Sequence, residues 1–389
     1  AGVSVVTGYP GTPSTEVLET VAKLKKRGRL PDVYVEWSVN EKTALEVAAG
    51  ASYSGARTLV TMKQVGLNVA SDPLMSLAYV GVKGGMVIVS ADDPGPISSQ
   101  TEQDTRRFAD FCRIPVFDPS SPEEAYKMIG EAFEYSEKYN TPVLFRPTTR
   151  VCHAYASIDN CDSPSPKKYE GFVKDSKKWV IFPRLSFANH IMIEKRNVEI
   201  GKDFSTYSAN KAEGVNSEKA VVTSGISYAY TKECLKDFPD VKLIKIATAY
   251  PFPEDFVLSS LEGAKEVLCI EELSPFIEEQ TLKLAGKHGL QLKVSGKLDG
   301  KVQAGGENST DKIAAILGEF LGKDFTAEGY DLSDAPALPV RPPVLCAGCP
   351  HRASFYAVKQ AMKGRKAYFC GDIGCYTLGN AMPLDMVDT

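Results

Sequence analysis

The stretch Tyr34-Val-Glu-Trp-Ser-Val-Asn-Glu41-Lys-Thr-Ala-Leu-Glu-Val-Ala-Ala-Gly-Ala-Ser-Tyr-Ser-Gly55 decides the fold that we expect. It predicts a strand, a sharp turn and then a helix, with Glu41 at the junction of turn and helix. A helix start offers free N–H groups and partial positive charge. The helix also carries small residues that allow another backbone or a flat ligand to come close: Ala44, Ala48, Ala49, Gly50 and Ala51. Glu41 is therefore a candidate for a single carboxylate that is kept dry and aimed at a ligand.

Glu41 also has a purely structural interpretation. Ser38 and Glu41 have the Ser-x-x-Glu spacing of a capping box, in which the Glu side chain accepts a hydrogen bond from the N-cap backbone N–H. Glu36 competes for the role of functional carboxylate, but it ends a strand just before the bulky Trp37 and is less well aimed. These alternatives stay open on the residues alone.

Residues 1–155 alternate between strand and helix patterns. Five apolar runs predict strands: Val3–Val6, Val33–Glu36, Arg57–Met62, Gly85–Ser90 and Pro142–Phe145. Helical patterns separate them, for example Ser14–Lys26, Glu41–Gly55 and Pro122–Lys138. Strands that alternate with helices predict a parallel sheet with helices on both faces.

Four distinctive turns follow the first four of these strands: Gly8–Ser14, Ser38–Glu41, Lys63–Gly66 and Ala91–Gly95. In a parallel sheet they all meet at the carboxyl edge, where ligands bind. Four special turns on one edge predict a binding site there more strongly than any one turn would.

The rest of the chain repeats the α/β plan, so the fold class we predict is several doubly wound parallel-sheet domains. Residues 156–218 are interpreted as a connecting segment with some helix, including the linker-like run Ser163–Lys168. Residues 219–322 predict a second, smaller βα series, 323–340 a linker, and 341–389 an incomplete third unit. In the second series, one of Glu271 and Glu272 is expected to cap the helix at Phe276–Gln280 or to bond across a domain seam.

Composition limits the function classes. The chain has 389 residues, with 43% hydrophobic and 24% charged residues, as in globular proteins. The net charge is −4 without a basic run, which argues against nucleic acid as a partner. No apolar segment approaches the ~20 residues that span a bilayer, so we expect no membrane association. Nine cysteines, an odd number in a long chain, favour a reducing cytoplasm over a disulfide framework.

A second group of chemically active residues begins at Cys346-Ala-Gly-Cys349-Pro-His351-Arg. A predicted helix, Ser354–Met362, and a predicted strand, Lys366–Phe369, lead to Cys370-Gly-Asp-Ile-Gly-Cys375-Tyr. The cysteine spacing is close to that of a zinc ribbon, with His351 as a possible replacement for one thiolate. Against zinc, these cysteines flank a helix and a strand, and a Gly-Asp-x-Gly turn after a strand suits a polar or phosphate-bearing ligand.

Several of these motifs occur together and in order in one known family. Tyr9-Pro-Gly-Thr-Pro-Ser-Thr, Glu36-Trp-Ser-Val-Asn-Glu-Lys, Cys346-Ala-Gly-Cys-Pro-His-Arg and Gly371-Asp-Ile-Gly-Cys-Tyr resemble the thiamine diphosphate-dependent 2-oxoacid:ferredoxin oxidoreductases, specifically the indolepyruvate ferredoxin oxidoreductase alpha subunits. The resemblance covers essentially the whole chain. It includes Ser98-Ser-Gln-Thr-Glu-Gln-Asp-Thr-Arg and Ile270-Glu-Glu-Leu-Ser-Pro-Phe-Ile-Glu-Glu-Gln.

The resemblance implies a domain order and an activity. Residues 1–155 would be the pyrimidine-binding domain, 219–322 a transketolase-C-like domain, and 341–389 the start of the diphosphate-binding domain. The implied reaction is oxidative decarboxylation of arylpyruvates with coenzyme A, giving an arylacetyl-CoA, carbon dioxide and reduced ferredoxin. A smaller beta subunit would complete the enzyme, as a dimer of heterodimers. Whether the cofactor site forms within one chain or across a dimer stays open.

The resemblance also assigns roles in the first domain. Glu41 would hold a proton against N1′ of the cofactor's aminopyrimidine, because burial of a carboxyl group disfavours its charged form. Thr12 would face the substrate carboxylate, or alternatively its hydroxyl satisfies its own turn. Gln64 and Gly66, expected in a loop after the third strand, would approach the pyrimidine.

Further roles fall on the third unit. Cys349, Asp372, Gly374 and Cys375 would line the thiazolium and diphosphate side of the cofactor. His351 would orient substrate or diphosphate, or alternatively is an exposed histidine with satisfied hydrogen bonds.

The chain departs from the family at its end. The Mg²⁺-binding Gly-Asp-x motif is expected beyond Thr389, so no residue here is assigned as a metal ligand. Gly371-Asp372 resembles that motif but matches an earlier turn. The segment expected to bind [4Fe–4S] clusters is also absent, and both ends look cut. Two rival interpretations remain: a thiamine-dependent decarboxylase or ligase without redox chemistry, and a zinc-stabilised module without catalysis.

Overall fold

The structure is a computed structural model that describes residues 1–159, 169–325, 333–339 and 342–389. The chain divides into two compact units, Ala1–Thr326 and Ala327–Thr389, each of which is described by itself. The predicted linker-like run Ser163–Lys168 lies outside the described residues, as does much of the predicted linker at 323–340. The domain boundaries inferred from the sequence stay predictions.

The first unit contains a six-stranded sheet in which every neighbouring pair of strands is parallel. The strand order is β2 (Tyr34–Trp37), β1 (Val5–Gly8), β3 (Thr58–Lys63), β4 (Met86–Ala91), β6 (Val143–Phe145) and β5 (Val116–Phe117). The five strands predicted from the sequence are confirmed. The two-residue strand β5 was not predicted, because two residues are too short to show a strand pattern.

Helices follow each strand of this sheet: α1 (Thr15–Lys26), α2 (Glu41–Tyr53), α3 (Gln64–Val69), α4 (Ser71–Val80), α5 (Thr105–Cys112), α6 (Pro122–Tyr139) and α7 (Thr149–His153). Two small residues of α2, Ala44 and Ala48, let this helix pack close to the sheet. The Thr7 hydroxyl on β1 donates to the Ala44 carbonyl at 2.8 Å, and Ala44 and Ala48 are fully buried. This close packing anchors the start of α2, where Glu41 lies.

A five-stranded sheet follows in the same unit, in the order β11 (Lys293–Ser295), β10 (Glu266–Ile270), β8 (Lys219–Ser224), β9 (Lys242–Ile246) and β7 (Lys211–Glu213). Four strands are parallel, as the predicted βα series implies, and β7, which lies before residue 219, adds an antiparallel edge. The helices of this part are α10 (Gly225–Cys234), α11 (Glu254–Ser260), α12 (Phe276–His288) and α13 (Thr310–Leu321). The fold class is α/β, as expected.

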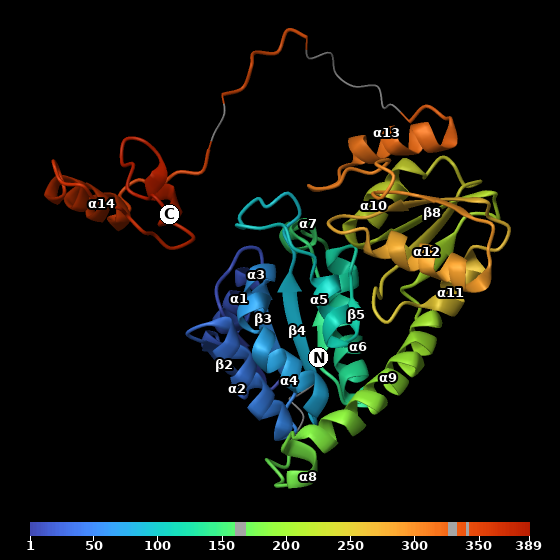
Figure 1. Ribbon diagram of the computed structural model, residues 1–389, viewed down its shortest axis with the longest axis horizontal. Helices are drawn as coiled ribbons and strands as arrows, with labels where there is room; N and C mark the ends of the chain where they lie inside the picture. The colour runs from blue at the N-terminus through green and yellow to red at the C-terminus, as the bar shows by residue number, and fades with distance from the viewer. Residues whose placement is uncertain (160–168, 326–332, 340–341) are drawn as a thin grey trace. The chain divides into compact units, whose positions relative to one another are not determined.

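A long helix, α9 (Pro183–Ser205), connects the two sheets after the short α8 (Ser176–Trp179). Figure 1 shows α9 running from below α4 to α11, both of which it contacts. The sequence predicted only some helix here. The buried positions of α9 do recur with a helical period, but Arg196 and Asn197 occupy two of them and interrupt the apolar pattern.

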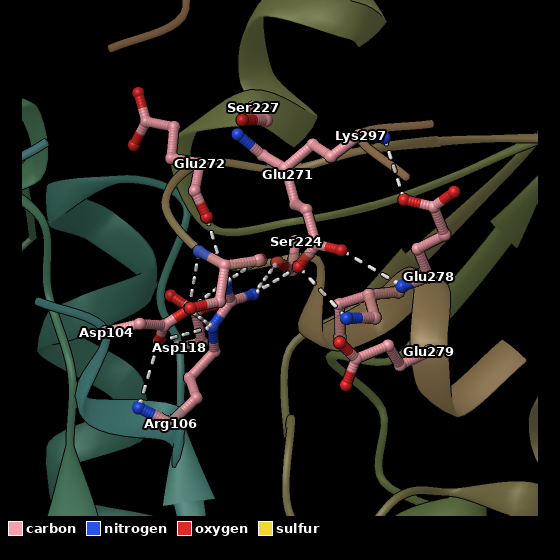
Figure 2. A network of polar contacts seen from close by, with 12 residues as sticks. Asp104, Arg106, Asp118, Ser224, Ser227, Glu271, Glu272, Glu278, Glu279 and Lys297 are labelled. Atoms are coloured by element: carbon pink, nitrogen blue, oxygen red, sulfur yellow. Dashed lines mark hydrogen bonds and ion pairs between the residues drawn. The ribbon is translucent and has the colours of Figure 1, made fainter. Parts of the chain in front are cut away.

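A buried cluster of charges joins the two sheets at Arg106 of α5 (Figure 2). The Arg106 guanidinium donates to Asp104 at 2.6 Å and to Glu271 at 2.8 Å, and all three side chains are at most 2% exposed. Glu271 also accepts from the backbone N–H groups of Ile277 and Glu278, each at 3.0 Å, at the start of α12. Glu271 therefore both caps this helix and bonds across the seam, which confirms the structural role expected for it.

A second buried arginine extends this cluster. Arg146 donates to Asp92 at 2.7 Å and to Asp118 at 3.2 Å, and its Nη2 has no hydrogen-bond partner in the part of the chain that the structure describes. Burial raises the pKa of Asp92 to about 6. Glu272 lies nearby, 5% exposed, and accepts from the Asn308 backbone N–H at 2.9 Å. Burial raises the pKa of Glu272 to about 7.

The second unit contains α14 (Pro350–Ala361) and the short 3₁₀ helix η1 (Thr377–Asn380). The strand predicted at Lys366–Phe369 is not formed. Two backbone hydrogen bonds, from Asp388 to Phe369 and from Gly371 to Thr389, link this stretch to the chain end, too few to make a ladder. Among its described residues, only Leu345, Gly379 and Met386 are buried.

Candidate active site

Glu41 is the first residue of α2, directly after the turn that ends β2. The N-cap is Asn40, whose side-chain oxygen accepts from the Thr43 backbone N–H at 2.8 Å. Ser38 instead donates to Glu36 at 2.9 Å. The capping-box interpretation of Ser38 and Glu41 is therefore wrong, because Asn40 already caps the helix.

The Glu41 carboxyl group is buried, with the residue 9% exposed. Burial raises its pKa, and its own backbone N–H and Lys63 only partly oppose this effect. Glu36 differs, since hydrogen bonds from Tyr34 and Ser38 lower the pKa of its carboxyl group. Of these two candidate carboxylates, Glu41 is the one whose environment favours the protonated form.

Gly66 packs directly against Glu41. A Cβ atom at position 66 would lie 2.5 Å from Oε1 and 2.6 Å from Cγ of Glu41. Gly66 belongs to α3, so it lies in a helix and not in the loop that the sequence predicted. The missing side chain at position 66 is what leaves room for the carboxyl group.

Gln64, the first residue of α3, is 1% exposed. Its Nε2 donates to the Thr101 carbonyl at 3.2 Å, and its Oε1 has no hydrogen-bond partner among the described residues. A buried amide oxygen without a donor is costly. This orphaned acceptor, together with the protonatable Glu41 that packs against Gly66, fits a ligand that carries both a hydrogen-bond donor and a ring nitrogen.

The other turns of this sheet edge meet around Lys63. Its ammonium donates to the Ser98 carbonyl at 2.8 Å, and the Ser98 hydroxyl donates to the Thr12 carbonyl at 3.3 Å. The exposed Thr12 hydroxyl makes no hydrogen bond in the described parts of the chain, because Ser14 and Thr15 satisfy the Gly11 backbone in that turn. The alternative in which the Thr12 hydroxyl forms a hydrogen bond within its own turn is therefore wrong.

Asp93 completes this edge. It is buried and accepts from the Ser98 backbone N–H at 2.9 Å, and from the Ser99 and Thr149 hydroxyls at 2.7 Å. Although burial opposes the charge, these hydrogen bonds lower the pKa of the Asp93 carboxyl group. The sequence interpretation did not single out Lys63 or Asp93, although both lie in turns that it recognised as special.

In the second unit, the structure brings two of the predicted residues together. Cys349, the N-cap of α14, lies with its Sγ 3.3 Å from Nδ1 of His351. The His351 ring packs edge-on against Tyr376, with centroids 4.7 Å apart. His351 is therefore half-buried against an aromatic ring and held by a thiol.

Asp372, Gly374 and Cys375 are exposed in a turn of the same unit. Asp372 accepts from the Ile373 backbone N–H at 2.7 Å, and Gly374 has a φ of +91°, which favours glycine. Within the described residues, no group of three or more His, Cys, Asp or Glu side chains is arranged to hold a metal ion. The prediction that these residues line the thiazolium and diphosphate side of the cofactor stays a prediction.

Comparison with known proteins identifies the family. The family described as pyruvate flavodoxin/ferredoxin oxidoreductase, thiamine diphosphate-binding, matches residues 1–213. The chain belongs to this family. The resemblance inferred from the sequence motifs is confirmed.

Named relatives match this chain along its whole length. This chain is 40% identical over 397 residues to the indolepyruvate oxidoreductase subunit IorA of Methanothermobacter thermautotrophicus. The match covers all of this chain and 63% of that relative. The corresponding subunit of Thermococcus kodakarensis is 40% identical over 403 residues, again covering all of this chain and 61% of the relative. The chain thus spans somewhat under two thirds of the length of these relatives.

Solved structures share the fold of this chain. The 2-oxoglutarate:ferredoxin oxidoreductase of Magnetococcus marinus, solved with 2-oxoglutarate, coenzyme A and succinyl-CoA bound, superposes with a TM-score of 0.61 at 17% identity, covering 82% of this chain and 62% of that chain. A split-gene transketolase, as an inactive tetramer, gives 0.51 at 13% identity and covers 82% of this chain and 92% of that one. Within the described residues, no helix is both long and apolar enough to cross a membrane.

Proposed function

We propose that this chain is part of the alpha subunit of a 2-oxoacid:ferredoxin oxidoreductase that acts on arylpyruvates. In the balanced reaction, an arylpyruvate, coenzyme A and two oxidised ferredoxins give an arylacetyl-CoA, carbon dioxide, two reduced ferredoxins and a proton. The carbon–carbon bond to the carboxylate breaks and a carbon–sulfur bond to coenzyme A forms. The names of relatives 37–40% identical over the whole chain support the indolepyruvate-type substrate.

The contact between Glu41 and Gly66 carries the proposal. A buried carboxyl group with a raised pKa, packed against a glycine whose missing side chain makes room for it, matches what an aminopyrimidine ring requires. The unpartnered Oε1 of Gln64 adds a second contact for such a ring. These three residues lie at the starts of α2 and α3, which follow β2 and β3, the two neighbours of β1 in the sheet.

Thiamine diphosphate, when bound, supplies a thiazolium that accepts the electrons of decarboxylation. Glu41 would hold a proton at ring nitrogen N1′, and its low exposure keeps competing water away. Gln64 would accept from an amino group of the ring through Oε1. Thr12 offers its free hydroxyl to the substrate.

The remaining roles follow the same proposal. Cys349, Asp372, Gly374 and Cys375 would contact the thiazolium and diphosphate side, and His351, fixed against Tyr376, would orient substrate or diphosphate. Magnesium would supply positive charge to the diphosphate, and iron–sulfur clusters would supply single-electron transfer to ferredoxin. A beta subunit, a dimer of heterodimers and a cytoplasmic location belong to this proposal too.

The test uses the complete enzyme, purified with its partner subunit. We expect stoichiometric thiamine diphosphate, bound iron, and viologen reduction that requires both an arylpyruvate and coenzyme A. Aromatic 2-oxo acids should give a higher kcat/KM than 2-oxoglutarate.

Two other outcomes separate the rival functions. Decarboxylation of arylpyruvate without iron and without viologen reduction would identify a non-redox decarboxylase or ligase. Stoichiometric zinc without thiamine diphosphate would identify a non-catalytic module and overturn the proposal.

A further inference from the structure

Lys63, the last residue of β3, has an unusual environment for a lysine. Its side chain lies flat across Gly11, where a Cβ atom would come 2.8 Å from Lys63 Cδ. The ammonium lies in the field of two carboxylates, Asp93 and Glu41, yet it forms no ion pair within 4 Å in the described chain. The Ser98 carbonyl accepts from it at 2.8 Å, which leaves two of its three N–H groups for another acceptor.

Several other cations in the segments that follow strands of this sheet are already paired. Lys42 pairs with Asp72 at 2.7 Å, away from Glu41. Arg106 and Arg146 lie inside the buried cluster, each bound to two acids. Arg150 pairs with Glu307 at 2.5 Å. Lys63 is thus the cation beside Glu41 that has donors to spare.

We propose that Lys63 binds the carboxylate of the 2-oxo acid substrate, with the Thr12 hydroxyl as a second donor. This inference rests on the function proposed above and names the group that recognises the acid. The flat path over Gly11 brings the lysine stem against the turn that contains Thr12, so both donors face the same edge of the sheet. Partial burial works against the charged ammonium, and an anionic ligand restores its stability.

Binding of the substrate carboxylate by Lys63 can be distinguished from a catalytic role of Lys63 by its effect on kcat and KM. The carboxylate departs as neutral carbon dioxide, so a cation that holds it stabilises the bound substrate and not the transition state that follows. Removal of Lys63 is therefore expected to raise KM without lowering kcat.

The experiment measures binding directly, on the complete enzyme with its partner subunit and cofactor. Calorimetry compares phenyllactate, which has the carboxylate but no keto group, with its neutral methyl ester. In Lys63→Met, we expect phenyllactate to bind about ten- to a hundredfold more weakly and the ester to bind as in the wild type. Lys63→Arg should recover part of the affinity, and Lys42→Met, the matched control, should bind both ligands normally.

Unchanged phenyllactate affinity in Lys63→Met would overturn the inference. Equal losses for phenyllactate and ester would also overturn it, because they would mean that Lys63 only holds the loop at Ser98. Thiamine diphosphate binding, followed by quenching of protein fluorescence, is measured separately. A wild-type enzyme that does not bind thiamine diphosphate would refute the proposed function. The difference in affinity between phenyllactate and its methyl ester decides the role of Lys63.

Discussion

Gly66 lies against the Glu41 carboxyl group so closely that a Cβ atom at position 66 would come 2.5 Å from Oε1. We predict that Gly66→Ala displaces this carboxyl group. Because misplacement of a catalytic group by about 1 Å can cost on the order of a hundredfold in rate, kcat/KM for an arylpyruvate should fall by roughly that factor. Steady-state viologen reduction and the thiamine diphosphate dissociation constant measure the effect.

Gly50 offers a matched control for that substitution. It lies inside α2, has an ordinary φ, and a Cβ atom there would meet nothing within 4 Å. Gly50→Ala should therefore increase the free energy of unfolding by about 0.5–1 kcal/mol and leave activity unchanged. Equal activity of the Gly66 and Gly50 variants would contradict a role for the gap at Gly66.

The Glu41 carboxyl group itself should be indispensable for turnover but not for folding. We predict that Glu41→Gln lowers kcat by about 10²–10⁴-fold, the typical contribution of a general acid or base. Its urea midpoint should stay near that of the wild type, because the start of α2 is capped by Asn40.

Asn40→Ala, at the same helix start, should lower stability, whereas Glu41→Gln should lower turnover. The lost cap to Thr43 should cost about 1 kcal/mol of stability, measured by urea unfolding. If Glu41→Gln were instead destabilised by that amount and still turned over, Glu41 would be a structural residue.

The sequence predicted the first sheet and Glu41 because the signals there are local. A buried parallel strand is an apolar run, and the turn after it shows in its glycines, prolines and polar residues. It also pointed to Gln64 and Gly66, but as loop residues. The helix α3 that holds them is only six residues long and lacks an amphipathic pattern.

The failures have a different physical origin, since they depend on partners far away in the chain. Helix α9 was underestimated because Arg196 and Asn197 are buried in it through tertiary packing. A strand at Lys366–Phe369 needs a neighbouring strand, which the pattern of one segment does not reveal. Lys63 was overlooked because its environment comes from Gly11, Ser98 and Asp93, which only the fold brings together.

The stability of the seam between the two sheets should depend strongly on Arg106. In Arg106→Met, Asp104 and Glu271 would be left buried without their cation. We predict a loss of about 3–5 kcal/mol in the free energy of unfolding, as for other broken buried pairs. Arg107→Met is the control next to it: Arg107 is partly exposed and pairs with Glu279, so less than about 1 kcal/mol should be lost. Similar losses in both variants would contradict the importance of the buried pair.

Glu272 should make stability depend on pH. Its pKa is about 7 in the folded protein against an ordinary value of 4.5, mainly because of burial. The folded state therefore holds this proton more tightly than the unfolded state, and the free energy of unfolding falls as the pH rises from 4.5 to about 7. We predict that Glu272→Gln is more stable than the wild type by about 1–3 kcal/mol at pH ~8, with little difference below pH ~4.5.

Urea unfolding of both proteins across this pH range measures that difference. Glu262→Gln, at an exposed position, serves as the control and should follow the wild type throughout. A stability gap between Glu272→Gln and the wild type that does not change with pH would show that the Glu272 carboxyl group does not titrate in this window.

Arg196 gives a prediction of the opposite sign from Arg106, because its charge is buried without a partner. It is 7% exposed, its Nε and Nη2 have no hydrogen-bond partner within the described chain, and burial lowers its pKa to about 10. Since an unpaired buried charge costs free energy, Arg196→Met, which keeps a long unbranched apolar stem, should stabilise the protein by about 1–3 kcal/mol. Lys195→Met, at the exposed neighbouring position, should change stability by less than about 0.5 kcal/mol. Thermal and urea unfolding of the purified chain compare the two, and a destabilised Arg196→Met would mean that the guanidinium is compensated by a group that this arrangement of α9 does not provide.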